Sequence, residues 1–120
     1  MDENRIDLKF ITPNLKLHTL FSFEDITPGE SILLGTVKAG MAVSYATVII
    51  SSPFDGSVSI TVGDSSLTTR ILEAADSNAG LEGSYSGDVD YIYSVATELY
   101  VYFPAGTPTT GSGEVFVYLS

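Results

Sequence analysis

The chain has 120 residues, no cysteine and a net charge of −10, and 44% of its residues are hydrophobic. This length suits one domain, and the hydrophobic content is near the globular average, which excludes wholesale disorder. The lack of cysteine excludes disulfides, thiol catalysis and zinc–thiolate sites, and the excess of 15 acidic over 5 basic residues disfavours direct binding to nucleic acid.

Residues 1–15 are expected to form an extended N-terminal arm. Charged residues alternate there with Ile6, Leu8 and Phe10, which is typical of a segment that lies along a sheet of its own chain or of a neighbour. A frayed end that contacts nothing is an equally good interpretation. The acidic start lacks the basic and apolar regions of a signal peptide, and no apolar run suits a membrane span, so we expect a soluble protein made in a cytoplasm.

The first half of the main domain reads as strands separated by turns. Apolar and polar residues alternate, or β-branched residues cluster, in three segments that we predict as strands: 16–23, 31–37 and 41–51. The stretch "SSPFDGSVSITVGDSS" (51–66) predicts a fourth strand between two turns. Its apolar residues at 58, 60 and 62 share one face, which we expect in the core, and its polar residues share a face in water or at an interface.

The second half begins with a segment that is hard to assign. Residues 67–83 predict a short helical turn or a loop, with a helix-like fragment at 71–75 that Thr68 or Thr69 would cap and Gly80 would end. Three further strands are predicted after it, at 89–96, 99–104 and 114–120, with residues 104–113 as a long hairpin loop.

Seven or eight strands at this spacing predict an all-β fold. We expect residues 16–120 to form a single antiparallel β-sandwich, jelly-roll-like, with the extended N-terminal arm attached.

Residues suited to catalysis or metal binding are sparse. The single histidine, His18, lies in a predicted strand, and no GxSxG motif is present, so a half-buried strand histidine is preferred over a catalytic one. Asp64, Asp76, Asp88 and Asp90 lie near loops, where hard cations bind, but they lack the spacing of a calcium loop. Asp88 and Asp90 would also share one side of a strand, a weak signal for glycoside hydrolysis. We therefore expect solvated acidic loops, with no enzyme activity, cofactor or metal.

The tyrosines are the most informative polar residues. Tyr100, Tyr102, Phe116 and Tyr118 lie opposite the aliphatic residues of their predicted strands. If all four were exposed, they would form a patch that self-association would cover. Aromatic pairs that only brace a sheet are the alternative. With the arm, the candidate interface residues are Ile6, Leu8, Phe10, Tyr100, Tyr102, Phe116 and Tyr118.

Three stretches share a longer pattern: "GTVKAGMAVSYATVIISSPFDGSVSITVGD" (35–64), "ILEAAD" (71–76) and "LYVYFPAGTPTTGSGEVFVYLS" (99–120). An "AG" turn precedes a strand that ends in "FDG", "ITVG" with an Asp follows, and a Gly-rich connection leads to a terminal "VFVYL" strand. This pattern resembles the small accessory virion proteins of tailed bacteriophages over most of residues 30–120. The residues of this chain that match it have turn-building roles: Ala39, Gly40, Phe54, Asp55, Gly56, Gly63 and Asp64.

The resemblance implies a structural protein of the virion. The expected role is a decoration or cement protein that binds the major capsid protein on the outer surface of the phage head and stabilises the capsid, as a homotrimer made in the host cytoplasm. It implies no catalysis, no cofactor and no contact with nucleic acid or membrane. The alternatives are a neck, tail or head-fibre attachment component, or a carbohydrate- or receptor-binding module with Tyr91, Tyr93 or Tyr100 as a stacking platform.

Overall fold

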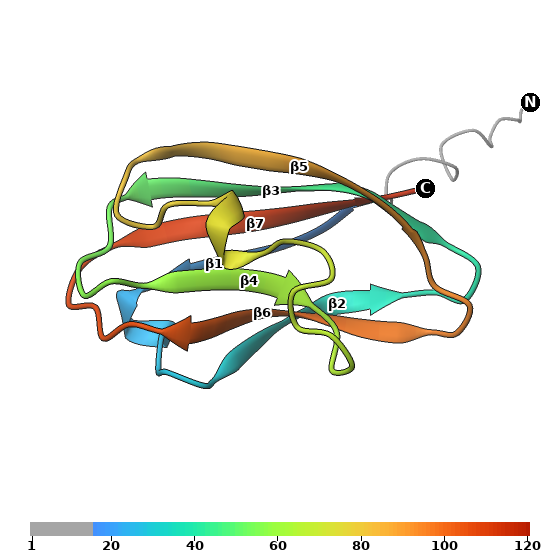
Figure 1. The fold of residues 1–120 in the computed structure, drawn as a ribbon, viewed down its shortest axis with the longest axis horizontal. Coiled ribbons are helices and arrows are strands. Elements are labelled where there is room, and N and C mark those ends of the chain that lie inside the picture. Colours follow the sequence, from blue (N-terminus) through green and yellow to red (C-terminus); the bar gives the residue numbers. More distant parts are fainter. Residues whose placement is uncertain (1–15) are drawn as a thin grey trace, which may run out of the picture.

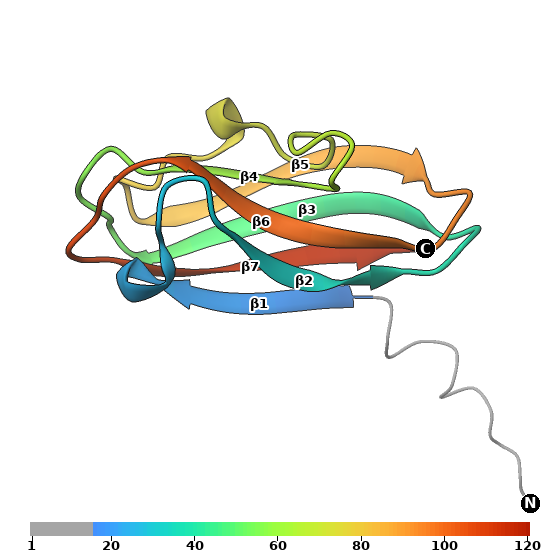
Figure 2. The same cartoon turned by 90° about the horizontal axis from the view of Figure 1, so that it is seen from below.

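Seven β-strands make up most of residues 16–120, the part of the chain that this computed structural model describes. In chain order they are β1 (Lys16–Ser22), β2 (Ser31–Val37), β3 (Ala42–Ser52), β4 (Ser59–Gly63), β5 (Gly83–Ile92), β6 (Thr97–Ala105) and β7 (Ser112–Leu119). They form a four-stranded sheet of order β1-β7-β3-β5 and a three-stranded sheet of order β2-β6-β4, which lie face to face (Figures 1 and 2). The predicted antiparallel β-sandwich is confirmed, and the predicted arm at 1–15 lies outside the described residues.

Consecutive strands lie in different sheets throughout. β6 pairs with β2 and β4, whereas β7 pairs with β1 and β3, so the connection at 104–113 crosses from one sheet to the other. The predicted hairpin at this point is therefore wrong. Alternation along the chain shows which side of a strand is apolar, but it does not show whether the next strand pairs with it or packs against it.

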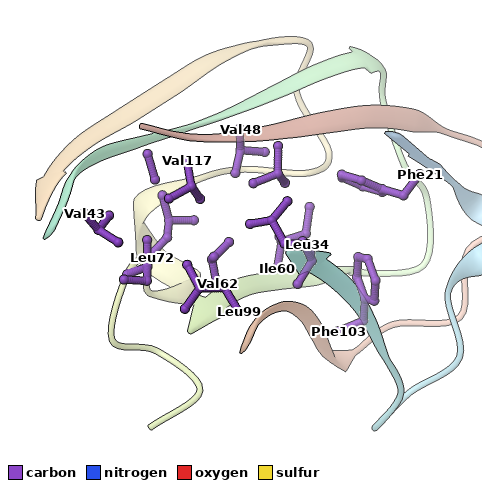
Figure 3. Close-up of a cluster of buried hydrophobic side chains, with 14 of the residues drawn as sticks. Phe21, Leu34, Val43, Val48, Ile60, Val62, Leu72, Leu99, Phe103 and Val117 are labelled. Atoms are coloured by element: carbon purple, nitrogen blue, oxygen red, sulfur yellow. The ribbon is translucent and has the colours of Figure 1, made fainter. Parts of the chain in front are cut away.

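The core lies between the sheets and is built from the inward residues of both (Figure 3). In β6 and β7 the buried residues alternate with half-buried ones, as the sequence predicts. The labelled core side chains include Val43, Val48 and Val117 from the larger sheet and Ile60, Val62, Leu99 and Phe103 from the smaller one. Each fully buried Val, Leu, Ile or Phe side chain contributes about 1.5–3 kcal/mol to folding, so this layer stabilises the sandwich.

The "FDG" segment fastens the β3–β4 connection to the β6–β7 connection. Phe54 is buried in the core, and the side chain of Asp55 accepts hydrogen bonds of 2.6 Å from both the backbone N–H and the hydroxyl of Thr109. Gly56 and Gly111 leave no room for a Cβ, because one would collide with the Thr107 backbone and the other with the Phe54 ring. The turn-building roles assigned to Phe54, Asp55 and Gly56 follow from these contacts.

The region from 67 to 83 contains one 3₁₀ turn, η3 (Ala74–Asp76), and otherwise runs as a loop. Glu73, and neither Thr68 nor Thr69, occupies the N-cap position of η3. Leu72 forms a bridge to Val62 of β4, and both side chains are buried. Of the helix-like fragment predicted at 71–75, Ile71 and Leu72 therefore pack against β4 with both side chains buried, whereas Ala74 and Ala75 belong to η3 and are exposed.

The strand predicted at 89–96 is shifted. β5 begins at Gly83 and ends at Ile92, and Val95, which was expected in that strand, is 65% exposed. The polar sequence of 83–88 gives a weak strand signal, but its backbone pairs with residues 45–50 of β3. A second short 3₁₀ turn, η2 (Phe23–Asp25), follows β1. Within residues 16–120, no helix is long and apolar enough to cross a bilayer.

Candidate interface surfaces

The outer surface of the four-stranded sheet carries an aromatic and apolar patch, here called the aromatic face. Its members come from three neighbouring strands and are His18, Leu20, Tyr45, Phe116 and Tyr118. The strand register brings them together: His18 lies opposite Phe116, and Tyr118 lies opposite Tyr45. All five alternate with inward residues of their strands, so they point away from the core.

The aromatic face is ordered by ring stacking. The rings of His18 and Phe116 lie 4.2 Å apart and nearly parallel, and those of Tyr45 and Tyr118 lie 4.5 Å apart. Phe116 and Tyr118 join the two pairs at 6.3 Å. The ammonium of Lys16 lies 5.2 Å from the centre of the Phe116 ring, in the range of a cation–π contact. Such contacts fix the side chains before any partner binds, which lowers the entropy lost on binding.

Hollows flank the aromatic face at both ends. One, of about 340 Å³, lies beside Leu20 and residues 112–113, and the other, of about 270 Å³, lies beside Tyr45 and residues 86–88. Leu20 is 67% exposed and Tyr45 is 39% exposed, so both offer apolar area to a partner. Large exposed side chains beside concave surfaces are the features that form the buried centre of a protein interface.

The structure divides the four aromatic residues predicted as one patch between two faces. Phe116 and Tyr118 lie on the aromatic face, whereas Tyr100 and Tyr102 of β6 lie on the outer surface of the three-stranded sheet, here called the opposite face. All four are half-buried. On the opposite face, the ring centres of Tyr100 and Tyr102 lie 5.8 Å apart. Contact between aromatic side chains of one sheet therefore accounts for part of the burial of these two residues.

The remaining candidate interface residues are Ile6, Leu8 and Phe10, and they lie outside the described residues. Three members of the aromatic face, His18, Leu20 and Tyr45, were not predicted as interface residues. Their outward positions follow from alternation, but their closeness to Phe116 depends on β1 and β3 flanking β7, and local alternation does not give that pairing.

The predicted loop carboxylate Asp64 is buried, with 3% of its surface exposed. Its side chain accepts hydrogen bonds from the backbone N–H groups of Ser66 and Leu67, from Nε of Arg70 at 2.7 Å and from the hydroxyl of Tyr93 at 2.8 Å. Burial alone would raise the pKa of Asp64, but the hydrogen bonds from Arg70, Tyr93 and the Leu67 N–H, together with the charge of Arg70, outweigh burial and hold the pKa below its usual value. Asp64 therefore joins the end of β4 to the end of β5.

The other candidate catalytic and metal-binding residues lie at the surface of the sandwich. His18 lies on an outward face, where its Nε2 lies 2.7 Å from a carboxylate oxygen of Glu114, and it is somewhat more exposed than expected. Asp76, Asp88 and Asp90 are exposed. Among residues 16–120, no group of three or more histidine or acidic side chains is arranged to hold a metal ion.

Comparison with known proteins identifies similar folds. No family model matches the sequence, and no curated protein matches it at a significant level. A chain in the capsid asymmetric unit of cyanophage Pam1 has 19% sequence identity and a TM-score of 0.61, with 87% of this chain and 80% of that chain covered. A chain in the acid-stable capsid of Helicobacter pylori bacteriophage KHP30 has 15% identity and a TM-score of 0.64, with 87% and 83% covered. At these identities the match establishes the fold.

Proposed function

We propose that this protein is a structural component of a tailed-phage virion that binds the outer surface of the assembled head as a decoration or cement protein. The observation that carries the proposal is the similarity to chains of comparable length in two phage capsids, each covered by 80% or more. The resemblance of residues 35–64 and 99–120 to accessory virion proteins supports the same role independently of the fold.

The strand order supports a jelly-roll-like assignment within this proposal. A jelly roll has eight strands in two facing sheets. Here every connection crosses between sheets of four and three strands, and residues 67–82 occupy the place of an eighth strand beside β4, where Leu72 bridges Val62.

The aromatic face is the surface that we propose for docking, either onto the major capsid protein or onto the other copies of a homotrimer. It presents Phe116, Tyr118 and exposed Leu20, and β1, the first described strand, forms an edge of the same sheet (Figure 1). Ile6, Leu8 and Phe10 of the arm would add a strand to a neighbouring subunit. The net charge of −10 suits a position outside the shell, away from packaged DNA.

A protein of this kind stabilises a capsid by mass action. It binds the assembled lattice and not the free coat subunit, so its binding free energy is added to the stability of the shell. No catalytic group is required for this role.

The geometry disfavours the carbohydrate-binding alternative at two of its three tyrosines. Tyr93 is 5% exposed and its hydroxyl donates a hydrogen bond to Asp64, so its ring is not available to a sugar. The guanidinium of Arg70 lies over the Tyr91 ring at 4.5 Å and competes with a sugar for one face of that ring. The hydroxyl of Tyr100 donates a hydrogen bond to Glu98, and its half-buried ring remains as a platform.

The copy number in purified particles, relative to the major capsid protein and measured by quantitative mass spectrometry, tests the proposal. A number near that of the capsid protein is expected for a decoration or cement protein. A small fraction of it would assign the protein to the neck, the tail or a fibre attachment at a single vertex. Failure of the purified protein to bind capsids that lack it would contradict a head-binding role.

A further inference from the structure

β5 forms an open edge of the four-stranded sheet. It pairs with β3 along one side, and among residues 16–120 no other backbone hydrogen bond reaches residues 83–92. The strand runs along the upper margin of the molecule, with no other labelled strand beyond it (Figure 1). An open edge presents a row of unpaired N–H and C=O groups, so β5 can accept an added strand.

Acidic side chains lie along this edge. Glu82, Asp88 and Asp90 are exposed, and residues 82–92 contain no basic residue. Asp90 has a φ of +52° and lies at an irregularity in the pairing with β3, so the regular part of the edge is residues 83–88. Pairing of β5 with β5 of another copy would bring carboxylates of both copies close together, which is unfavourable. The edge therefore favours a strand that carries basic residues.

The sequence of residues 5–10, RIDLKF, meets this requirement. Its apolar residues at 6, 8 and 10 alternate with Arg5, Asp7 and Lys9, as in a strand with one apolar face. The segment has two basic residues and one acidic residue, whereas residues 16–120 have 3 basic and 12 acidic residues. Attraction between opposite charges therefore favours contact of this segment with the edge of β5.

We propose that residues 5–10 of a second copy of this chain pair with residues 83–88 of β5 as an added antiparallel strand. The proposal names the acceptor for the N-terminal arm. It rests on the strand-adding role that the proposed function gives to the arm, but not on the position of the protein in a virion. Backbone hydrogen bonds would provide affinity, and side-chain pairs would fix the register.

The charged side chains favour one register of this pairing. Its opposed residues on the outer side of the sheet are Arg5 with Asp88, Asp7 with Ser86, and Lys9 with Ser84. Arg5 thereby meets a carboxylate, and Lys9 lies diagonally beside Glu82. A hollow of about 270 Å³, lined by Tyr45 and residues 86–88, would take the long side chain of Arg5.

The same register suits the apolar residues of the arm, which lie opposite residues 83, 85 and 87. Tyr85 is half-buried against the core, so this side of β5 is the inner one. Gly83 and Gly87 have no side chain, and a Cβ added at Gly87 would meet nothing within 4 Å. A glycine within a strand is often a site where another backbone approaches closely. Ile6 and Phe10 would lie across from the two glycines, where large side chains have room.

The arm of the same chain is too short for this register. Lys16 lies level with Asp88 through the paired residues of β7 and β3, but at the opposite edge of the sheet. A residue opposite Gly83 would lie five residues along the strands and four strand spacings across them from Lys16, about 25 Å in all. The six peptide units between Phe10 and Lys16 span at most about 22 Å. The added strand therefore comes from a second copy.

The test uses disulfide formation, since the chain has no cysteine of its own. Full-length Asp7→Cys and tagged full-length Ser86→Cys are mixed at equal concentration and oxidised. The control mixture pairs Asp7→Cys with Thr36→Cys, because Thr36 is exposed on β2, an edge strand of the other sheet. Opposed residues of paired strands lie close enough for a disulfide, so at least about fivefold more heterodimer than in the control is expected. A non-reducing gel and mass spectrometry measure the heterodimer.

Charge reversal tests the register. Asp88→Arg, added to the Ser86→Cys chain, is expected to lower the yield of heterodimer about fivefold, the upper limit for an exposed ion pair. Arg5→Glu, added to the Asp7→Cys chain, is expected to restore it. Glu98→Arg in place of Asp88→Arg makes the same change at an exposed carboxylate of β6 and should leave the yield unchanged. Circular dichroism shows whether each variant is folded.

Two results would overturn the proposal. The first is no excess of heterodimer over the control at up to about 1 mM protein, where even a millimolar Kd would leave much of the protein paired. The second is a disulfide only within single chains of the double variant Asp7→Cys, Ser86→Cys, which would show that the arm pairs with its own β5. Both experiments use purified protein without capsids. Failure of head binding would therefore leave this inference standing, and failure to form the heterodimer would leave the proposed head binding intact.

Discussion

The hydroxyl of Tyr93 donates a 2.8 Å hydrogen bond to the carboxylate of Asp64, 29 residues earlier in the chain. The bond is buried and links the turn after β4 to the residue that follows β5. Tyr93→Phe removes the donor and is expected to lower the free energy of unfolding by about 1.5–3 kcal/mol, the usual contribution of a hydrogen bond to a charged group. Urea unfolding followed by circular dichroism measures the change.

Asp64→Ala is expected to lower the free energy of unfolding more, by about 2–4 kcal/mol, because it removes every acceptor of this cluster and leaves Tyr93 unpaired. Tyr91→Phe is the matched control, since it removes a neighbouring tyrosine hydroxyl for which the structure gives no hydrogen bond to Asp64. Equal effects of Tyr93→Phe and Tyr91→Phe would show that the bond to Asp64 does not stabilise the fold.

Stability is expected to fall in acid because of Asp64 and Asp55. Hydrogen bonds hold the pKa of both carboxyls below the ordinary 3.8, those to Asp64 against the opposing effect of burial. A carboxyl with a lowered pKa contributes stability that is present above its unfolded pKa and is lost as the pH falls through the folded pKa. The free energy of unfolding should therefore decrease from about pH 5 towards pH 2, and the decrease should be smaller in Asp64→Asn. An identical pH profile in that variant would contradict the role of Asp64.

Gly111 is expected to be intolerant of any side chain. Its φ of +124° is unfavourable for other residues, and an added Cβ would collide with the Phe54 ring. Gly111→Ala should lower the free energy of unfolding by about 2–4 kcal/mol, from overpacking and backbone strain together. Gly87→Ala is the control, because a Cβ there meets nothing within 4 Å, and it should change stability by less than about 0.5 kcal/mol. Thermal unfolding of the two variants would show similar midpoints if the contact with Phe54 were unimportant.

The strands could be predicted from the sequence where one face is apolar. β2 has the bounds expected for it, and β6 and β7 bury the residues that alternation assigns to the core. β5 could not be predicted from its first half, because residues 83–88 are polar or small apart from Tyr85 and are held by pairing with β3. The position of β5 depends on pairing with β3, whose residues lie more than 30 positions earlier in the chain, and local strand propensity carries no information about that pairing.

The candidate interface could be predicted only in part. Alternation gives the outward direction of Phe116 and Tyr100, but the two faces separate because β6 and β7 lie in different sheets. Asp64 was expected to build a turn, which it does through Ser66 and Leu67, but nothing in its local sequence indicates burial beside Tyr93. Contacts between residues far apart in the sequence decide both the separation of the two faces and the burial of Asp64.

Deletion of residues 1–12 is expected to weaken binding to capsids without unfolding the sandwich. The described core residues run from Phe21 to Leu119, all outside the deleted segment, so the thermal midpoint should change little. Binding should fall because Ile6, Leu8 and Phe10 would no longer add a strand to a neighbour. Co-sedimentation with capsids that lack the protein measures the effect, and a full-length Ile6→Ser, Leu8→Ser, Phe10→Ser variant is the control for chain length. Unchanged binding of the truncated protein would show that residues 1–12 do not contribute to capsid binding.

The two outer faces are expected to differ in their effect on assembly. Phe116 lies at the centre of the aromatic face, and Phe116→Thr puts a β-branched residue, which strands also favour, in its place, so β7 should persist. If this face docks onto the capsid or onto another copy, loss of the ring removes a central apolar contact, and binding should weaken about tenfold or more. Tyr100→Thr makes a matched aromatic change on the opposite face and should alter binding less than about twofold.

Binding of each variant to capsids that lack the protein, together with its oligomeric state by sedimentation, distinguishes the possible outcomes. Weaker capsid binding with the oligomer intact would assign the aromatic face to the capsid contact, and loss of the oligomer would assign it to contacts between copies. The reverse pattern, with Tyr100→Thr impaired and Phe116→Thr unaffected, would contradict docking by the aromatic face. The proposed interface would then lie on the three-stranded sheet, because the aromatic residues of β6 and β7 point away from the core in opposite directions.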